Sequence, residues 1–333
     1  MVLNLASILE AHQRLKLHSI CQNTPIISSD VINDTISEAV GRLISVNFKC
    51  EHLQTVGSFK IRGALNFALS LPVSELRKGL ITHSSGNHGA AVACVGKYMG
   101  VPVAVVIPRD APIGKIERIR KYGATIHMCE PTLQDRQAMC SFIANDSGMT
   151  EVPPFDHDWI MAGQGTQAIE IIESVNNVDA IVVAVGGGGM LSGILTAVKE
   201  FNSSIKVFGI EPENANSTCA SLQEKVRRGP TTAGLTTVCD ALRVFPPGKR
   251  CWEIISQRCD GVFTVDDDSV IWALKLCLTE LKQLVEPSGS CALAGVLSDE
   301  FLRLLRDNIS IKNIVVVLCG GNTEIEFLRN VLV

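Results

Sequence analysis

The sequence predicts an α/β protein with two lobes, each built on a mostly parallel sheet covered by helices. Short apolar, β-branched runs alternate with helical stretches, which is typical of parallel βαβ units. These runs are continuously apolar rather than alternating, as expected where helices cover both faces of a sheet. The chain has 333 residues, more than one small hydrophobic core requires, and this length favours two lobes.

The expected strands are residues 44–48, 79–83, 103–107, 180–185, 207–210, 261–265 and 314–318. The expected helices are residues 89–98, 115–122, 165–174, 190–201 and 269–284. Prolines interrupt the pattern near residues 100–112 and again at Pro153 and Pro154. We therefore expect residues 78–152 to form a smaller, mobile lobe inserted into a larger lobe of residues 1–77 and 153–333.

Composition favours a small-molecule partner. Apolar residues make up 46% of the chain and charged residues 19%, and the formal net charge is only -4. This balance argues against a nucleic-acid footprint and against disorder. The 12 cysteines are scattered without a C-x-x-C pair, as in reduced proteins, and residues 1–12 lack the features of a secretory signal. We expect a cytoplasmic protein.

One apolar segment, residues 180–198, is long enough to span a bilayer. Four consecutive glycines inside it would leave backbone groups unpaired in a membrane. A buried strand, a glycine loop and the start of a helix account for the same residues, so we expect no membrane contact.

Lys60 lies in an unusual setting, the run Gly57-Ser58-Phe59-Lys60-Ile61-Arg62-Gly63-Ala64. Burial disfavours an ammonium ion, so such a lysine can lose its proton near neutral pH and attack an aldehyde. A surface lysine lying along an apolar patch would explain this segment equally well.

Gly186, Gly187, Gly188 and Gly189 follow an expected strand and precede an expected helix. Backbone N–H groups there can close around a phosphate, and the helix dipole adds favourable charge. The spacing fails the dinucleotide fingerprint, because Leu191 or Ser192 stands where its last glycine would be. The loop therefore favours a lone phosphate group over NAD or ATP.

Two more strand ends carry polar residues: Ser84-Ser85-Gly86-Asn87-His88 and Cys319-Gly320-Gly321-Asn322. The first suits a substrate carboxylate, although ordinary helix capping by Ser84 or Ser85 would also explain it. Ligands of α/β sheets collect beyond the carboxyl ends of strands, so we expect all four segments to meet.

These segments together resemble the serine racemase and serine/threonine dehydratase family of fold-type II pyridoxal-phosphate enzymes. The resemblance runs from about Thr24 to Asn322 and includes SFKIRGA, SSGNHG, AGQGT, the tetraglycine, VEPSG and CGGN. It implies the tryptophan synthase β-like fold, a cofactor-binding larger lobe and a homodimer. The substrate would be a small amino acid.

The resemblance also implies roles for individual residues. Lys60 would bind pyridoxal 5'-phosphate as a Schiff base, and Ser85 would serve the opposite face of the substrate Cα. The cofactor would contact Phe59, Asn87, Gly186, Gly187, Gly188, Gly189, Met190 and Cys319. The substrate would contact Ser84, Ser85, Asn87, His88 and Arg136. Because a neutral thiol at Cys319 cannot hold a pyridinium as an aspartate would, the cofactor should be a weaker electron sink.

We expect interconversion of L- and D-serine, with β-elimination of serine to pyruvate and ammonia as a side activity. An L-serine/L-threonine dehydratase without racemisation is the alternative, since the Pro154-Phe155-Asp156 stretch is more similar to dehydratases. An aspartate racemase is a third reading, in which Arg136 would hold the β-carboxylate.

Two further sites are implied by the resemblance but altered in this sequence. A Mg²⁺ or Mn²⁺ site would use Glu211 and the carbonyl of Ala215, yet Ser217 replaces an acidic ligand, so we expect weaker binding. A nucleotide site would use Lys115, Tyr122 and Asn322. Thr55 and Ala90 replace a lysine and a glutamine associated with ATP in this family, which argues against ATP activation.

Overall fold

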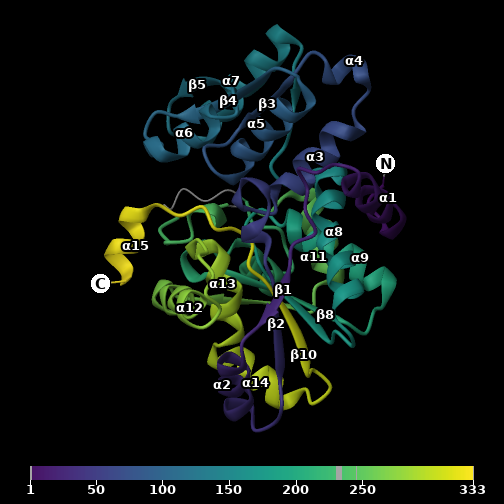
Figure 1. Ribbon diagram of the computed structural model, residues 1–333, viewed down its shortest axis with the longest axis vertical. Coiled ribbons are helices and arrows are strands. Elements are labelled where there is room, and N and C mark those ends of the chain that lie inside the picture. The colour runs from purple at the N-terminus through teal and green to yellow at the C-terminus, as the bar shows by residue number, and fades with distance from the viewer. Residues whose placement is uncertain (1, 230–234, 245, 333) are drawn as a thin grey trace.

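The computed structural model describes residues 2–229, 235–244 and 246–332, and these form two lobes (Figure 1). The larger lobe contains a six-stranded sheet in the order β1-β2-β10-β7-β8-β9, and the smaller contains a four-stranded sheet in the order β5-β4-β3-β6. Within the described residues, the ladders of both sheets are parallel except that of β1 with β2. The predicted fold class is confirmed.

The strands are β1 (Ile26–Ser28), β2 (Ser45–Lys49), β3 (Leu80–His83), β4 (Val103–Pro108), β5 (Thr125–Cys129), β6 (Thr150–Glu151), β7 (Ala180–Ala184), β8 (Lys206–Pro212), β9 (Gly261–Val265) and β10 (Asn313–Val317). The helices are α1 (Leu5–Lys16), α2 (Asp30–Val40), α3 (Lys60–Ser70), α4 (Val73–Leu76), α5 (Asn87–Met99), α6 (Ile113–Arg120), α7 (Leu133–Ser147), α8 (Asp158–Ser174), α9 (Gly189–Phe201), α10 (Ser217–Glu224), α11 (Lys249–Arg258), α12 (Asp267–Thr279), α13 (Pro287–Val296), α14 (Asp299–Asp307) and α15 (Ile325–Leu332). Short 3-10 turns are η1 (Glu51–Leu53), η2 (Thr55–Gly57), η3 (Glu213–Ala215) and η4 (Asp240–Leu242).

The seven expected strands are present as β2, β3, β4, β7, β8, β9 and β10, each within two residues of its predicted bounds. The prediction missed β1, β5 and β6, which are short or lie at a sheet edge. Two helix bounds were wrong. Helix α8 begins at Asp158 because the His157 side chain caps it, and α12 ends at Thr279, three residues before Lys282 takes a left-handed backbone (φ 57°).

The larger lobe has its core around β7, whose five residues are all buried. Helix α9 follows directly, with ten buried residues of its thirteen. The apolar segment 180–198 is therefore divided between a strand and a helix, as expected. Within the described residues, no helix is long and apolar enough to cross a membrane.

The smaller lobe has a separate hydrophobic cluster that includes α5 and β4. Helix α3 contributes Ile61, Leu65 and Ala68 to this cluster, although it precedes the smaller sheet in the chain. The core of the smaller lobe thus draws on residues outside 78–152. Helix α3 lies at the junction between the lobes (Figure 1), and its first residue is Lys60.

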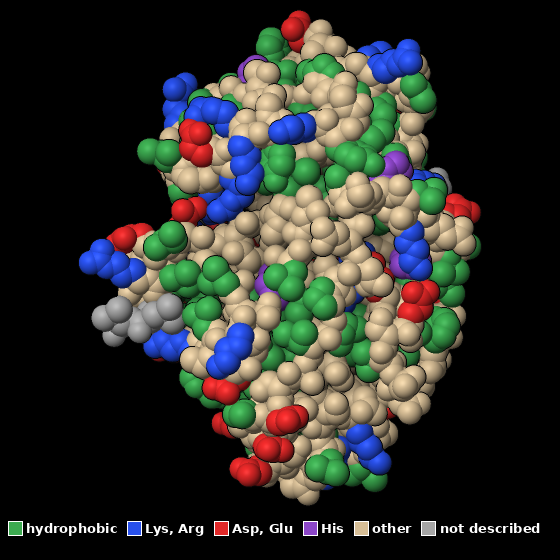
Figure 2. Space-filling model, viewed as in Figure 1, with side chains coloured by type: hydrophobic (Ala, Val, Ile, Leu, Met, Phe, Trp, Pro, Cys, Tyr) green, Lys and Arg blue, Asp and Glu red, His purple; other side chains and the backbone are tan. Residues whose placement is uncertain are grey.

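The molecular surface fits the modest net charge. The face shown in Figure 2 has charged side chains of both signs scattered around its margins, and its centre is mostly uncharged. Several Lys and Arg side chains lie close together on the smaller lobe in this view.

A buried ionic network supports the start of α3. Arg62 donates to both carboxylate oxygens of Glu51 (2.8 Å each) and of Glu170 (2.7 Å each). The ammonium of Lys49 also binds Glu170, at 2.6 Å. Burial alone would raise the pKa of Glu170, but Arg62 and Lys49 hold it below its usual value. The network links β2, η1, α3 and α8, and nothing in the sequence patterns had predicted it.

Replacing Arg62 with Ala should lower the free energy of unfolding by about 3–5 kcal/mol, because two buried carboxylates would lose their main partner. Urea denaturation at pH 7 measures the change. The control is Arg329→Ala, since Arg329 is 75% exposed and its loss should change stability by less than about 0.5 kcal/mol. Equal stabilities of the two variants would contradict this account.

Candidate functional site

Three of the predicted segments, those of Lys60, Asn87 and Cys319, come together where parallel strands of both lobes end. Ser58 forms a β-bridge with Gly320, and the amide of Phe59 donates to the carbonyl of Cys319 at 3.2 Å. The Asn322 side chain, which follows β10, donates to Oδ1 of Asn87 at 2.8 Å. These contacts join the Lys60 segment, the end of β10 and the start of α5, as the sequence led us to expect.

Lys60 has the properties of an amine nucleophile. Its Nζ donates to the carbonyl oxygen of Pro154 at 2.9 Å and lies 5.1 Å from the centre of the Phe59 ring. Burial lowers the pKa of Lys60 to about 8, although Cys319, Cys251 and Glu286 oppose this shift. Half of these amines would be neutral at about pH 8, whereas an exposed lysine is almost fully protonated there.

The tetraglycine loop forms the N-terminal end of α9. Gly188 precedes this helix with a left-handed backbone (φ 92°), and no side chain caps the helix. Among the hydrogen bonds of the described residues, none is donated by the amides of residues 186–190. A helix start with free amides is a ready site for a phosphate group.

Phe155 explains why two of these positions require glycine. A Cβ atom at Gly187 would lie 2.4 Å from the Phe155 ring, and one at Gly189 would lie 2.8 Å from Phe155 Cβ. The Pro154-Phe155-Asp156 segment therefore packs directly on the loop while Pro154 receives the Lys60 amine. Asp156 also accepts the amides of Lys249 and Cys251, at 2.9 and 3.1 Å, and so caps α11.

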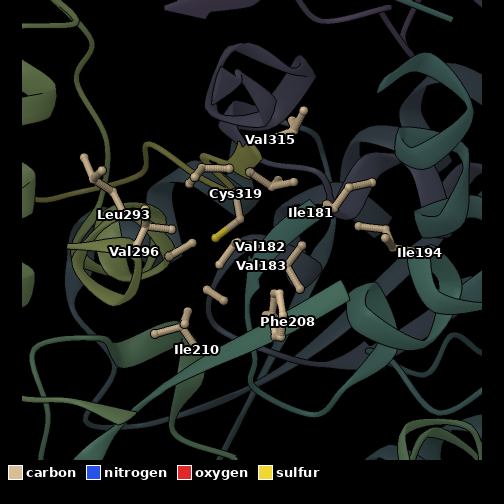
Figure 3. Packing of buried hydrophobic residues seen from close by; sticks show 14 of the residues in the cluster. Ile181, Val182, Val183, Ile194, Phe208, Ile210, Leu293, Val296, Val315 and Cys319 are labelled. Carbon is tan, nitrogen blue, oxygen red and sulfur yellow. The ribbon is translucent and has the colours of Figure 1, made fainter. Parts of the chain in front are cut away.

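Cys319 lies just beyond β10, among buried side chains of the central strands (Figure 3). Its sulfur donates to the carbonyl of Ser288 at 3.2 Å, and the residue is 4% exposed. Burial and the nearby Glu286 raise the pKa of the Cys319 thiol well above its usual value. The thiol is therefore neutral, as the sequence argument assumed.

Residues 84–86 form the loop between β3 and α5, which we call the serine loop. Contacts with its backbone hold it in place. A Cβ atom at Gly89 would lie 2.0 Å from the Ser84 carbonyl oxygen, so this glycine allows the helix to approach the loop. The Ser84 hydroxyl accepts the amide of Gly86 at 3.3 Å. The Ser85 hydroxyl forms no hydrogen bond with another described residue, so it is free to meet a ligand.

The side chain of His88 has a structural partner. Its Nε2 donates to the carbonyl of Val152 at 3.0 Å, and the ring is buried. Burial, reinforced by the charge of Lys60, lowers the pKa of His88 to about 3, so the ring is neutral. The imidazole links α5 to the segment after β6. A substrate would therefore contact the backbone of His88 rather than its side chain.

Arg136 lies on α7 and is partly exposed, with its Nε bound to the Thr132 carbonyl at 3.4 Å. It is close enough to His83 to add to the effect of burial, which lowers the pKa of that histidine. His83 directly precedes Ser84. The structure thus brings a cation near the serine loop.

The residues of the implied cation site are already engaged. The two oxygens of Glu211 accept the amides of Thr218 and Cys219 at 3.0 and 2.8 Å, and Ala215 is buried in η3. Burial raises the pKa of Glu211 to about 7, although these two amide hydrogen bonds oppose the shift. No cluster of three or more His, Cys, Asp or Glu residues suited to a metal occurs within the part of the chain described. The cation site remains a prediction.

The three residues implied for a nucleotide site do not all lie together. Lys115 and Asn322 line one cavity of about 500 Å³, in which Lys115 pairs with Asp240. Tyr122 packs against the hydrophobic cluster of the smaller lobe instead. The nucleotide site also remains a prediction.

Glu286, to which the sequence patterns assigned no role, lies at the centre of the site. It accepts the Asn87 side chain and the Asn322 amide at 2.8 and 3.1 Å. The available signal was the VEPSG segment of the family resemblance, in which Glu286 directly precedes Pro287 at the start of a helix.

Comparison with known proteins identifies the family. Residues 19–320 match the family described as pyridoxal-phosphate dependent enzyme. The serine racemase of Dictyostelium discoideum is 39% identical over 98% of this chain and 97% of its own length. Maize serine racemase has a solved structure with a TM-score of 0.92 and 34% identity, covering 100% of this chain and 97% of the maize chain. A solved pyridoxal 5'-phosphate-dependent aspartate racemase has a TM-score of 0.91 and 33% identity, covering 97% of each chain. The resemblance inferred from the motifs is confirmed.

The cofactor-free protein should react with a simple aldehyde at Lys60 at a rate that rises with pH and levels off above about pH 8. The neutral amine is the nucleophile, and burial favours it. Borohydride trapping followed by peptide mass analysis measures the rate at each lysine. Lys16 is 54% exposed and serves as the control, since it lacks the burial that favours a neutral amine. A shared midpoint for both lysines would contradict the argument.

Proposed function

The chain belongs to the pyridoxal-phosphate dependent enzymes, and we propose that it is a serine racemase with serine ammonia-lyase side activity. It would interconvert L- and D-serine and release pyruvate and ammonia from part of the substrate. The observation that carries the proposal is the buried amine of Lys60, whose pKa is lowered to about 8 and which lies close enough to His88, just after the serine loop, to lower the pKa of that histidine. The similarity to serine racemases supports the choice of substrate.

The site residues suit the cofactor of this family. The free amides of residues 186–190 would hold its phosphate, and Lys60 would attach it covalently. Phe59 and Asn87 would contact its ring and phenolic oxygen, and Cys319 would face its ring nitrogen. When bound, the cofactor withdraws electrons from the substrate Cα and so makes the α-proton acidic.

Racemisation requires proton transfer on both faces of Cα. Lys60 Nζ would take the proton on one face, since its lowered pKa makes the neutral amine available near about pH 8. The hydroxyl of Ser85 would hold or return a proton on the other face. Ser84 and the backbone of residues 85–88 would bind the substrate carboxylate at the start of α5.

Cys319 favours rapid return of the proton. Its thiol stays protonated and donates to Ser288, so it brings no negative charge to the ring nitrogen. Without that charge, less electron density from Cα can be stored, and reprotonation or loss of the β-hydroxyl should follow quickly.

A dehydratase without racemisation is the second candidate, and Phe155 favours it. Its ring packs against Gly187 beside the Lys60 amine, which makes this side of the site apolar. An aspartate racemase is the third candidate, supported by the solved relative and by Arg136 near the serine loop. A homodimer, weak binding of Mg²⁺ or Mn²⁺ and little activation by ATP complete the proposal.

The experiment that tests the proposal incubates the pure holoenzyme separately with L-serine, L-threonine and L-aspartate, with and without magnesium and ATP. D-amino acid and keto acid are quantified together. D-serine with some pyruvate is expected, and keto acid alone would favour the dehydratase.

Ser85→Ala should lower the rate of D-serine formation by about 10²-fold or more, because one face of Cα loses its proton carrier. Formation of pyruvate from L-serine should fall much less, since elimination needs the proton removed from one face only. Chiral chromatography and a keto acid assay on one sample give both rates. Ser84→Ala is the matched control, and it should reduce both rates in similar proportion.

Replacing Arg136 with Ala tests whether this residue of α7 binds a β-carboxylate of the substrate. If the enzyme is a serine racemase, serine turnover should change by less than about threefold, because serine has no β-carboxylate to bind. An aspartate racemase would instead lose aspartate turnover by about 10²-fold, with a rise in KM. Equal losses on both substrates would remove the argument that Arg136 recognises a β-carboxylate.

A further inference from the structure

Three side chains from separate segments form a hydrogen-bonded cluster across the seam between the lobes. Asn87 is the first residue of α5 in the smaller lobe, Glu286 precedes α13 in the larger lobe, and Asn322 follows β10. Asn87 Nδ2 donates to Glu286 Oε1 at 2.8 Å, and Asn322 Nδ2 donates to Asn87 Oδ1 at 2.8 Å. The Asn322 backbone amide donates to Glu286 Oε2 at 3.1 Å.

Burying the carboxyl group of Glu286 without a counter-ion costs free energy. The residue is 3% exposed, and no salt bridge to it occurs among the described residues, since the nearby Lys115 pairs with Asp240. Burial, reinforced by Asp240, raises the pKa of Glu286 to about 8, although its two hydrogen bonds and Lys115 oppose this shift. A buried carboxyl group without a counter-ion is typical of functional sites rather than of stabilising contacts.

The cluster fixes which way the Asn87 amide faces. Asn322 Nδ2 donates to the Val56 carbonyl at 2.6 Å, so this side chain presents an N–H group to Asn87. Oδ1 of Asn87 must therefore accept from Asn322, which leaves Nδ2 of Asn87 to donate to Glu286. One hydrogen of Asn87 Nδ2 is left for another acceptor.

Gly320 leaves room for this arrangement. A Cβ atom at this position would lie 2.6 Å from Glu286 Oε1 and 3.2 Å from Asn87 Nδ2. Its φ lies outside the left-handed region, so the glycine is needed for space rather than for backbone conformation. The close approach of Gly320, Glu286 and Asn87 is thus a second feature that depends on the cluster.

We propose that Glu286 is a positioning residue that, with Asn322, orients the Asn87 amide toward the cofactor and holds the start of α5 against the larger lobe. This inference rests on one part of the proposed function, the binding of the cofactor, and does not require racemisation. The free Nδ2 hydrogen of Asn87 would donate to the phenolic oxygen of the cofactor. The serine loop directly precedes α5, so its place over the site would depend on the same contact.

The proposal is tested by exchanging the hydrogen-bond donor and acceptor between Asn87 and Glu286. Glu286→Gln leaves one acceptor oxygen for two donors, so either Asn87 Nδ2 or the Asn322 amide loses its partner. In Asn87→Asp, two carboxylates face each other at about pH 9, where Glu286 is ionised. In the double variant, the side-chain amide introduced by Glu286→Gln can donate to the carboxylate introduced by Asn87→Asp, while the contacts with Asn322 are kept. The contact between the lobes is restored there, but the hydrogen-bond donor toward the cofactor is not.

Two measurements that need no turnover are made on each variant. Hydrogen exchange of residues 84–90 in the cofactor-free protein reports the lobe contact. Titration with pyridoxal 5'-phosphate, followed by its visible absorption, reports the cofactor. Each single variant should lose about tenfold in exchange protection and about tenfold in cofactor affinity, the effect of one hydrogen bond to a charged group. The double variant should regain protection while its affinity stays low and its absorption maximum stays shifted.

Glu324→Gln is the matched control, because Glu324 lines the same cavity and pairs with Arg118 at 3.8 Å. Both of its readouts should stay within about twofold of the wild type. Normal protection and affinity in Glu286→Gln would overturn the proposal, as would a double variant that is no better protected than the single ones. A wild type that binds the cofactor without racemising serine would refute the proposed function but not this inference.

Discussion

Parallel pairing of strands is the constraint on which the site depends. Strand β10 pairs in parallel with β2 and β7, and β7 pairs in parallel with β8, so the carboxyl ends of these strands lie on the same side of the larger sheet. The loops that follow them must therefore share one small volume. The smaller sheet brings the end of β3 to the same place, since α5 starts there and contacts Asn322. Residues that are 235 positions apart, such as Asn87 and Asn322, become neighbours in this way.

Burial divides the ionisable groups into two kinds. Arg62, Glu51, Glu170 and Lys49 lie in the interior with opposite charges in contact, so they support the framework as ion pairs. Lys60 and Glu286 lack such partners at the site, and burial moves the pKa of each to about 8. The first kind holds helix α3 in place, and the second kind places groups that can change protonation near neutral pH where the ligand would lie.

Much of this arrangement could be predicted because its signals are local. The apolar run of β7 and the four glycines after it stand next to each other in the chain, and the structure keeps them as a strand and a helix start. Strand β5 was missed because its alternating residues at the sheet edge dilute the apolar pattern. The Arg62 network and Glu286 were missed for a different reason. Their partners lie up to 199 positions away, and a lone charged residue looks the same in a sequence whether it is buried or exposed.

The position of α3 has a mechanical consequence. The helix packs into the core of the smaller lobe, yet the amide just before its first residue is bound to Cys319 of the larger lobe. Lys60 is therefore tied to both lobes, because its helix is buried in the core of one and the residue before it is bound to the other. A substitution in either core that displaced α3 would move the amine as well, so the position of the nucleophile depends on packing far from the ligand.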